Sequence, residues 1–66
     1  MTITLNGEER IVPPRTTVDG LVETLGLPRR GIAVAVDHVI VPRSQWGSAV
    51  IGLGAEVDIV TAMQGG

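Results

Sequence analysis

The sequence predicts an α+β fold in which one helix crosses a mixed sheet of about five strands. Alternating apolar residues open the chain and end at Asn6-Gly7, a dipeptide typical of a tight hairpin turn. A helical spacing of apolar residues follows over about residues 17–25. Short segments rich in β-branched residues then complete the order β-β-α-β-β-β. We interpret this order as a β-grasp arrangement forming one domain over residues 1–66, in which the first and last strands lie side by side and parallel.

The opening hairpin has clear limits. Met1, Ile3 and Leu5 alternate with threonines, which is typical of a strand buried on one face. The return strand is expected at about residues 9–12, because Pro13-Pro14 cannot donate hydrogen bonds to a neighbouring strand.

The helix carries signals at both ends. Thr16 or Thr17 is expected to cap its N-terminus, and Asp19 in the first turn suits the helix dipole. Gly26 is placed for a left-handed C-terminal cap. Gly20 costs about 0.8–1 kcal/mol relative to alanine inside a helix, and a close contact with the sheet would explain its presence.

The second half of the chain predicts three more strands. An apolar run at residues 32–36 is followed by a turn at Asp37-His38 and a short strand at 39–41. A helical turn near 43–46, with Ser44 as a possible cap, and a loop at 47–55 come next. The last strand is expected over residues 55–63, with Glu56 and Asp58 on the face opposite Val57.

The predicted core combines the apolar faces of the helix, of the first strand and of the last strand. Its members are Ile3, Leu5, Val18, Leu21, Val22, Leu25, Val57 and Ile59.

The composition excludes several classes of function. The 66 residues include no cysteine, which rules out disulfides, Fe–S clusters and thiolate zinc sites, and a single histidine rules out two- and three-histidine metal sites, so we expect no metal. Five arginines against seven acids, without a basic run, argue against nucleic-acid binding. No apolar run approaches the ~20 residues that span a bilayer, and the N-terminus has no signal-peptide pattern. We expect a cytoplasmic protein with no membrane partner and no bound cofactor.

The side chains offer little catalytic chemistry. A serine–histidine–acid triad would require His38, which lies in a predicted turn and is expected to be an exposed histidine. The Glu8-Glu9 and Arg29-Arg30 pairs are expected to be solvated loop charges. We therefore expect that this chain is not an enzyme by itself.

The remaining reactive group is the α-carboxylate of Gly66. It is ionised at neutral pH, so it must be activated, for example as a mixed anhydride with AMP, before a sulfur or nitrogen nucleophile can attack it. Gly65 lacks a Cβ atom, and with Gln64 it would let the tail thread into a narrow partner active site. A tail over residues 62–66 would reach roughly 17 Å.

A chain whose terminus reacts in a partner's active site needs a surface that the partner binds. Strand alternation puts Val60 and Ala62 on the same outer face as the two acids of the last strand, and exposed apolar residues beside the tail predict a docking patch. Trp46 is expected in the core or as a lid, and Arg43 as an ordinary surface arginine.

The chain resembles the sulfur carrier proteins of thiamine biosynthesis, the ubiquitin-like ThiS family. The resemblance covers essentially the whole chain and rests on "AVAVDHVIVPRSQW", "LGAEVDIVTA" and the terminal "GG". It implies that a ubiquitin-activating-type adenylyltransferase uses ATP to adenylate Gly66. It also implies that a sulfur donor system converts the terminus to a thiocarboxylate, whose sulfur goes to thiazole synthase.

Three other functions remain open at this point. The small subunit of molybdopterin synthase also ends in two glycines and becomes a thiocarboxylate, although the "VPRSQW" segment argues against it. A protein modifier would instead join its terminal glycine to lysines of other proteins. A passive interaction domain would have an inert terminus.

Overall fold

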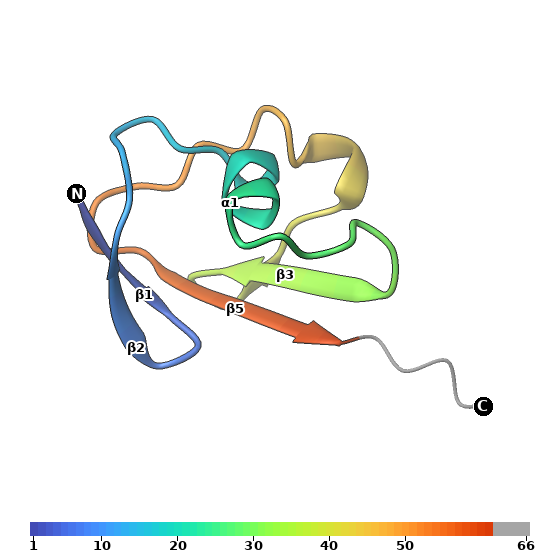
Figure 1. Cartoon of the computed structure of the whole chain (residues 1–66), viewed down its shortest axis with the longest axis horizontal. Helices are drawn as coiled ribbons and strands as arrows, with labels where there is room; N and C mark the ends of the chain where they lie inside the picture. Colours follow the sequence, from blue (N-terminus) through green and yellow to red (C-terminus); the bar gives the residue numbers. More distant parts are fainter. Residues whose placement is uncertain (62–66) are drawn as a thin grey trace.

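The computed structural model describes residues 1–61, and these form a five-stranded mixed sheet with one α-helix packed on it (Figure 1). The strands are β1 (Thr2–Leu5), β2 (Glu8–Ile11), β3 (Ile32–Val36), β4 (Val39–Ile40) and β5 (Glu56–Thr61). The α-helix is α1 (Val18–Thr24), and a short 3₁₀ turn, η1, spans Arg43–Gln45. The structure confirms the predicted element order.

The sheet order is β2-β1-β5-β3-β4, so β5 is the central strand. It pairs in parallel with β1, as predicted for the first and last strands, and antiparallel with β3. Figure 1 shows α1 and η1 on the same side of the sheet, with no segment of residues 1–61 over the other face. The sheet therefore has a covered face, packed against α1, and an open face.

Both predicted hairpin turns use residues in left-handed conformations. Asn6 and Gly7 have φ values of 49° and 83°, and Asp37 and His38 have φ values of 51° and 70°. Two successive positive φ angles form a two-residue turn whose twist matches that of the flanking strands. Asparagine, aspartate and glycine are favoured at such positions because they tolerate positive φ. The two turns define the registers of β1 with β2 and of β3 with β4.

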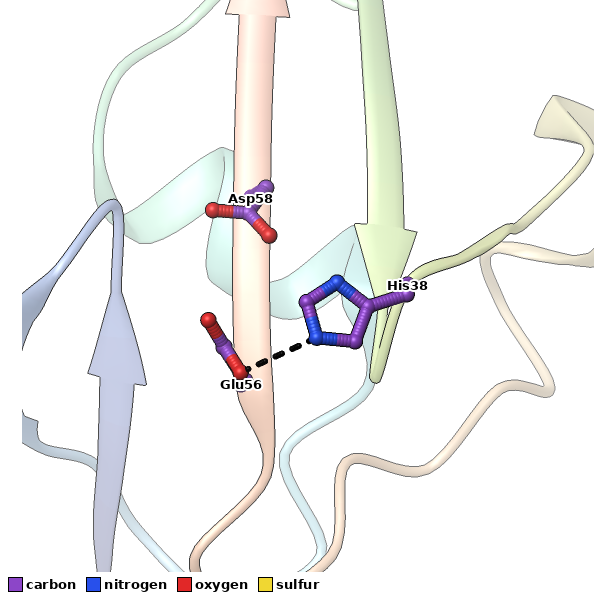
Figure 2. A group of neighbouring side chains, drawn as sticks. All are labelled: His38, Glu56 and Asp58. Carbon is purple, nitrogen blue, oxygen red and sulfur yellow. Dashed lines mark ion pairs between the residues drawn. The ribbon is translucent and has the colours of Figure 1, made fainter.

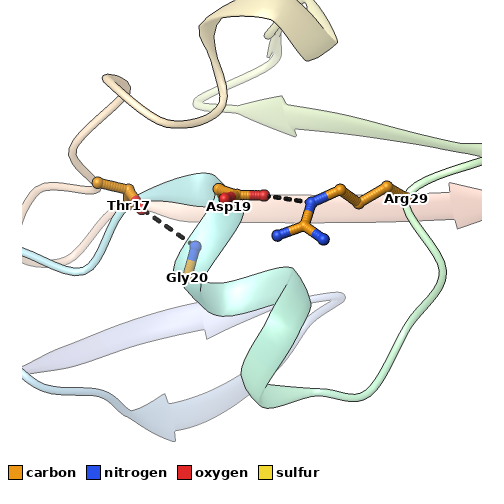
Figure 3. A network of polar contacts seen from close by, with 4 residues as sticks. All are labelled: Thr17, Asp19, Gly20 and Arg29. Carbon is orange, nitrogen blue, oxygen red and sulfur yellow. Dashed lines mark hydrogen bonds and ion pairs between the residues drawn. The ribbon is translucent and has the colours of Figure 1, made fainter.

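The helix caps follow the sequence closely. Thr17 is the N-cap, and its hydroxyl oxygen accepts a 3.0 Å hydrogen bond from the N–H of Gly20 (Figure 3). Gly26 follows the C-cap with φ of 71°. By contrast, the predicted cap of the later helical turn is wrong, because Ser44 lies inside η1 and the N-cap is Pro42, which has no capping side chain.

The expected sheet contact of Gly20 is also wrong. A Cβ atom added at this position would lie 3.3 Å from the Thr17 hydroxyl oxygen, and it would meet no atom of the sheet within 4 Å. The space around Gly20 is therefore limited by the capping interaction of its own helix.

The core lies between α1 and the covered face of the sheet. Six of the predicted core residues are buried there, whereas Leu25 and Ile59 are only partly buried and pack against its edge. Leu25 is the C-cap that follows α1, and Ile59 lies in the second half of β5, so both are at the edge of the core. The core also includes residues that the pattern analysis did not assign to it: Val12, Val34, Ile51 and Ala55.

Trp46 is a core residue, as expected. Its side chain is 3% exposed, and its indole Nε1 donates a 2.9 Å hydrogen bond to the carbonyl oxygen of Val41. This bond satisfies the one polar atom of the ring inside the core. The loop after η1 is thereby fixed to the end of the β3–β4 hairpin.

Arg29 is an exposed loop charge, as expected, and it also makes a specific ion pair. Its Nε lies 2.6 Å from Oδ1 of Asp19, in the first turn of α1 (Figure 3). This hydrogen bond lowers the pKa of the Asp19 carboxyl below its ordinary value. Both side chains are substantially exposed, so the pair is a surface contact that connects the segment before β3 to the start of α1.

Candidate functional site

The strand that leads to the predicted tail is held at the centre of the sheet. β5 forms hydrogen-bonded ladders with β1 on one side and with β3 on the other. The tail residues assigned from the sequence, Ala62, Gln64, Gly65 and Gly66, lie outside the described residues. The candidate site is therefore the end of β5, together with the surface beside it.

Asn6 contributes an unexpected contact that holds β5 near its end. Its backbone N–H donates to the carbonyl oxygen of Val57 at 2.9 Å, and its side-chain oxygen accepts from the N–H of Ile59 at 2.8 Å. In a regular parallel ladder the N–H of Ile59 would bond the backbone carbonyl oxygen of Asn6. Here the backbone turns away into the hairpin, and the side chain of Asn6 replaces that carbonyl.

The local sequence signal of Asn6 indicated only the hairpin turn. An asparagine in a tight turn is common, and nothing nearby in the sequence shows that its side chain bonds a residue 53 positions later. The parallel pairing of β1 with β5, which the fold class implies, was the one signal that could have found this contact.

Four apolar side chains from three strands gather on the open face beside the end of β5. We call them the open-face patch: Ala33, Ala35, Ile40 and Val60. In the sheet register Ala33 is opposite Val60, and Ala35 is opposite Ile40, so these side chains share one face. Val60 and Ile40 are 57% and 64% exposed. The prediction that Val60 faces outward is confirmed.

The open-face patch has an acidic border on β5. Glu56 and Asp58 alternate with the buried Val57, which puts them on the same face as Val60. Asp58 is directly opposite Ala35 in the register with β3. The open face thus combines an exposed apolar area with carboxylates, an arrangement suited to a partner surface that is apolar with basic residues at its edge.

His38 lies at the same border, but it has no serine beside it that would form a triad. The structure places its Nε2 3.3 Å from Oε1 of Glu56 (Figure 2). The side chain is 74% exposed, which confirms the expected exposed turn histidine. Its contact with Glu56 was not expected, because the sequence did not show which strand would lie beside this turn.

Residues 1–61 enclose no pocket. No helix within them is long and apolar enough to cross a membrane. The feature that the described residues present at the end of β5 is the open-face patch with its acidic border.

Known proteins are similar to this chain in fold and in sequence. A crystal structure of the thiamine biosynthesis protein ThiS from Geobacter metallireducens superposes with a TM-score of 0.84 at 22% identity, covering 100% of both chains. This similarity confirms the predicted β-grasp fold.

Sequence comparison then identifies the family. A thiazole synthase from Paramagnetospirillum magneticum is 35% identical over 66 residues, which is all of this chain and 20% of that protein. The chain therefore spans about a fifth of the length of this curated relative. The ThiS family model matches residues 3–66. The chain belongs to the ThiS family, which confirms the resemblance found in its sequence.

Proposed function

We propose that this protein is the sulfur carrier of thiazole formation in thiamine biosynthesis. The observation that carries the proposal is the ThiS family match, which extends over residues 3–66 and includes the two terminal glycines. In this proposal the α-carboxylate of Gly66 is activated, converted to a thiocarboxylate, and used as the sulfur donor for the thiazole ring.

The chemistry at Gly66 follows from the properties of a carboxylate. Its negative charge repels nucleophiles, so a partner adenylyltransferase first joins it to the AMP part of ATP and releases pyrophosphate. A sulfur nucleophile at the oxidation level of sulfide then displaces AMP and leaves the thiocarboxylate. The carrier supplies the acyl group and is the co-substrate of both steps, while ATP binds to the partner enzyme.

The tail is suited to entering a partner's active site. Gly65 and Gly66 have no Cβ atoms, so a narrow channel can accommodate them in conformations that other residues avoid. Gln64 would occupy the mouth of such a channel. The body of the protein would stay outside, held by its own surface.

The open-face patch supports the docking part of the proposal. Val60 is exposed two positions before Ala62 in the sequence, so in this proposal the patch and the tail would meet the partner at the same end of β5. We propose that the activating enzyme docks on this patch, with basic side chains facing Glu56 and Asp58. Thiazole synthase is the proposed acceptor of the sulfur, because the relative that contains a segment similar to this chain is itself named thiazole synthase.

The test is the intact mass of the purified protein after incubation with ATP, a sulfur donor and an extract of its source organism. We expect a mass increase equal to the exchange of one oxygen atom for one sulfur atom. Deleting Gly66 should abolish the increase, and replacing Gly65 with valine should slow it while the protein stays folded.

Other results would favour other functions. Conjugates in which the mass of this chain is added to lysines of other proteins would show a protein modifier. A thiocarboxylate that the purified large subunit of molybdopterin synthase consumes, and thiazole synthase does not, would reassign the carrier to molybdopterin formation. An unchanged mass, with the protein folded and its terminus intact, would contradict the carrier proposal.

A further inference from the structure

Three side chains with metal-ligating atoms converge at the acidic border of the open-face patch. They are His38, in the turn between β3 and β4, and Glu56 and Asp58 on β5. One imidazole nitrogen and one carboxylate oxygen from each acid all lie within 4.8 Å of one another. Figure 2 shows the His38 ring reaching from the turn toward the two carboxylates.

The spacing of these atoms is close to that of a metal site. Zinc binds imidazole nitrogen and carboxylate oxygen at about 2.0–2.2 Å, which separates neighbouring tetrahedral ligand atoms by about 3.3–3.6 Å. The 3.3 Å between His38 Nε2 and Glu56 Oε1 is already in this range. The remaining separations are at most 4.8 Å, and side-chain rotations of the exposed His38 and Glu56 and the half-buried Asp58 would close them.

The backbone beneath the three side chains is fixed by hydrogen bonds. The N–H of Asp37 donates to the carbonyl oxygen of Glu56 at 2.7 Å, and Oδ1 of Asp37 accepts from the N–H of Glu56 at 3.0 Å. The turn that carries His38 is thereby joined to β5 at the residue that carries the first carboxylate. Metal binding would order side-chain torsions and would leave the backbone as it is.

The type of ligand set selects the class of metal. Carboxylates alone suit magnesium or calcium, whereas an imidazole nitrogen favours zinc and other divalent transition metals. The lone histidine of the chain excludes sites with two or three histidines, but it is sufficient for this mixed set. The two carboxylates would offset the charge of a divalent ion.

We propose that His38, Glu56 and Asp58 bind one divalent transition-metal ion, with water completing its coordination. The site is separate from the reaction at Gly66 and does not depend on the sulfur-carrier proposal. It lies at the border of the open-face patch, so a bound divalent ion would neutralise the negative charge of the two carboxylates on that surface.

The test is to titrate zinc chloride into the full chain and to record NMR spectra at each step. The pH is set where imidazoles are largely unprotonated. His38 is the only histidine, so its ring signals report binding without ambiguity. We expect saturable shifts of these signals and of the Glu56 and Asp58 amides. Magnesium chloride at the same concentrations should leave the ring signals unchanged.

Variants distinguish zinc binding by all three side chains from zinc binding by the His38 imidazole alone. The double variant Glu56→Gln with Asp58→Asn should weaken zinc binding at least about tenfold, since even outer-shell changes at metal sites cost 10–100-fold. Glu23→Gln, which removes an exposed carboxylate on α1, should leave the affinity unchanged. His38→Asn keeps a residue that tolerates positive φ and should abolish the saturable amide shifts.

Two results would overturn the proposal. Equal zinc affinity in the wild type and the double carboxylate variant would show that the imidazole binds alone. The absence of saturation in the wild type would show that the three side chains do not act together.

Discussion

The side-chain oxygen of Asn6 accepts a 2.8 Å hydrogen bond from the backbone N–H of Ile59, joining the first hairpin to the end of the central strand. This contact extends the parallel ladder of β1 and β5 by one bond at the point where the backbone of β1 has already turned away. It therefore holds β5 close to the position from which the tail continues.

Replacing Asn6 with glycine should destabilise this connection without disturbing the turn. Glycine keeps the positive φ angle and removes only the acceptor, so we expect a loss of roughly 0.5–1.5 kcal/mol in the free energy of unfolding. Hydrogen exchange at the Ile59 amide should accelerate more than exchange at Val34 in the core. Asn6→Asp, which retains an acceptor oxygen, should preserve most of the protection, and equal exchange in all three proteins would refute the role of this contact.

Replacing Val60 with glutamate should weaken activation by the partner enzyme while the fold is retained. A charge placed in the open-face patch would have to be desolvated against an apolar partner surface, and we expect the activation rate at limiting carrier to fall at least about tenfold, equivalent to about 1.4 kcal/mol. The measurement is the rate of the mass change at the terminus.

Leu53→Glu is the matched control for this variant. Leu53 is 78% exposed in the loop before β5, outside the open-face patch. Its replacement should leave the activation rate within about twofold of the wild type, which is the size of effect typical of surface changes worth less than 0.5 kcal/mol. Equal losses in the two variants would show that docking does not use this patch specifically.

Gly20 and Thr17 should be coupled in their effects on stability. Alanine at position 20 improves helix propensity by about 0.8–1 kcal/mol, but its Cβ would lie 3.3 Å from the hydroxyl oxygen of Thr17. In the wild type we expect the gain in unfolding free energy to be smaller than the propensity alone predicts. Thr17→Ala alone should cost about 1 kcal/mol, because it removes the N-cap.

The full gain of Gly20→Ala should return in the Thr17→Ala background, where no hydroxyl remains to be crowded. Denaturant unfolding of the four proteins measures the coupling directly. If the two substitutions change the free energy of unfolding additively, the Thr17 side chain moves away from the added Cβ at no cost, and the contact does not affect stability.

The Asp19–Arg29 pair predicts a pH dependence of stability. The hydrogen bond from Arg29 lowers the folded-state pKa of Asp19, so the unfolded chain binds the proton more readily than the folded protein does. The contribution of the pair is therefore present above the ordinary aspartate pKa of about 3.9 and is lost as the pH falls through the lower folded-state value.

Thermal unfolding of the wild type and of Asp19→Asn across this range is the measurement. The wild type should be slightly more stable at neutral pH, and the difference should disappear in acid. The effect should be small, since both side chains are exposed to solvent and salt screens them. Arg29→Gln should reduce the same difference, and a difference that persists unchanged in strong acid would contradict the assignment.

Local chemistry made much of this fold predictable. The turns at Asn6-Gly7 and Asp37-His38, the cap at Thr17 and the helix end at Gly26 depend on the residue itself and on neighbours within one turn. Strand alternation likewise showed that Val60 faces away from Val57, because successive side chains in a strand point to opposite faces. The predicted cap at Ser44 was wrong because η1 begins at Arg43, so Ser44 lies inside the turn and not before it.

The sequence by itself determined the order of the elements and the family, because each of these is encoded in short, contiguous patterns. The residues of the tail stay a prediction, since they lie outside the described residues. Only the tertiary structure decided which distant residues meet: Asn6 with Ile59, and His38 with Glu56. Each of these contacts joins segments brought together by strand pairing, and alternation along one strand carries no information about the side chains of its neighbours. The open-face patch and the candidate metal site exist because β5 lies between β1 and β3, an arrangement established when the helix and the sheet bury their common core.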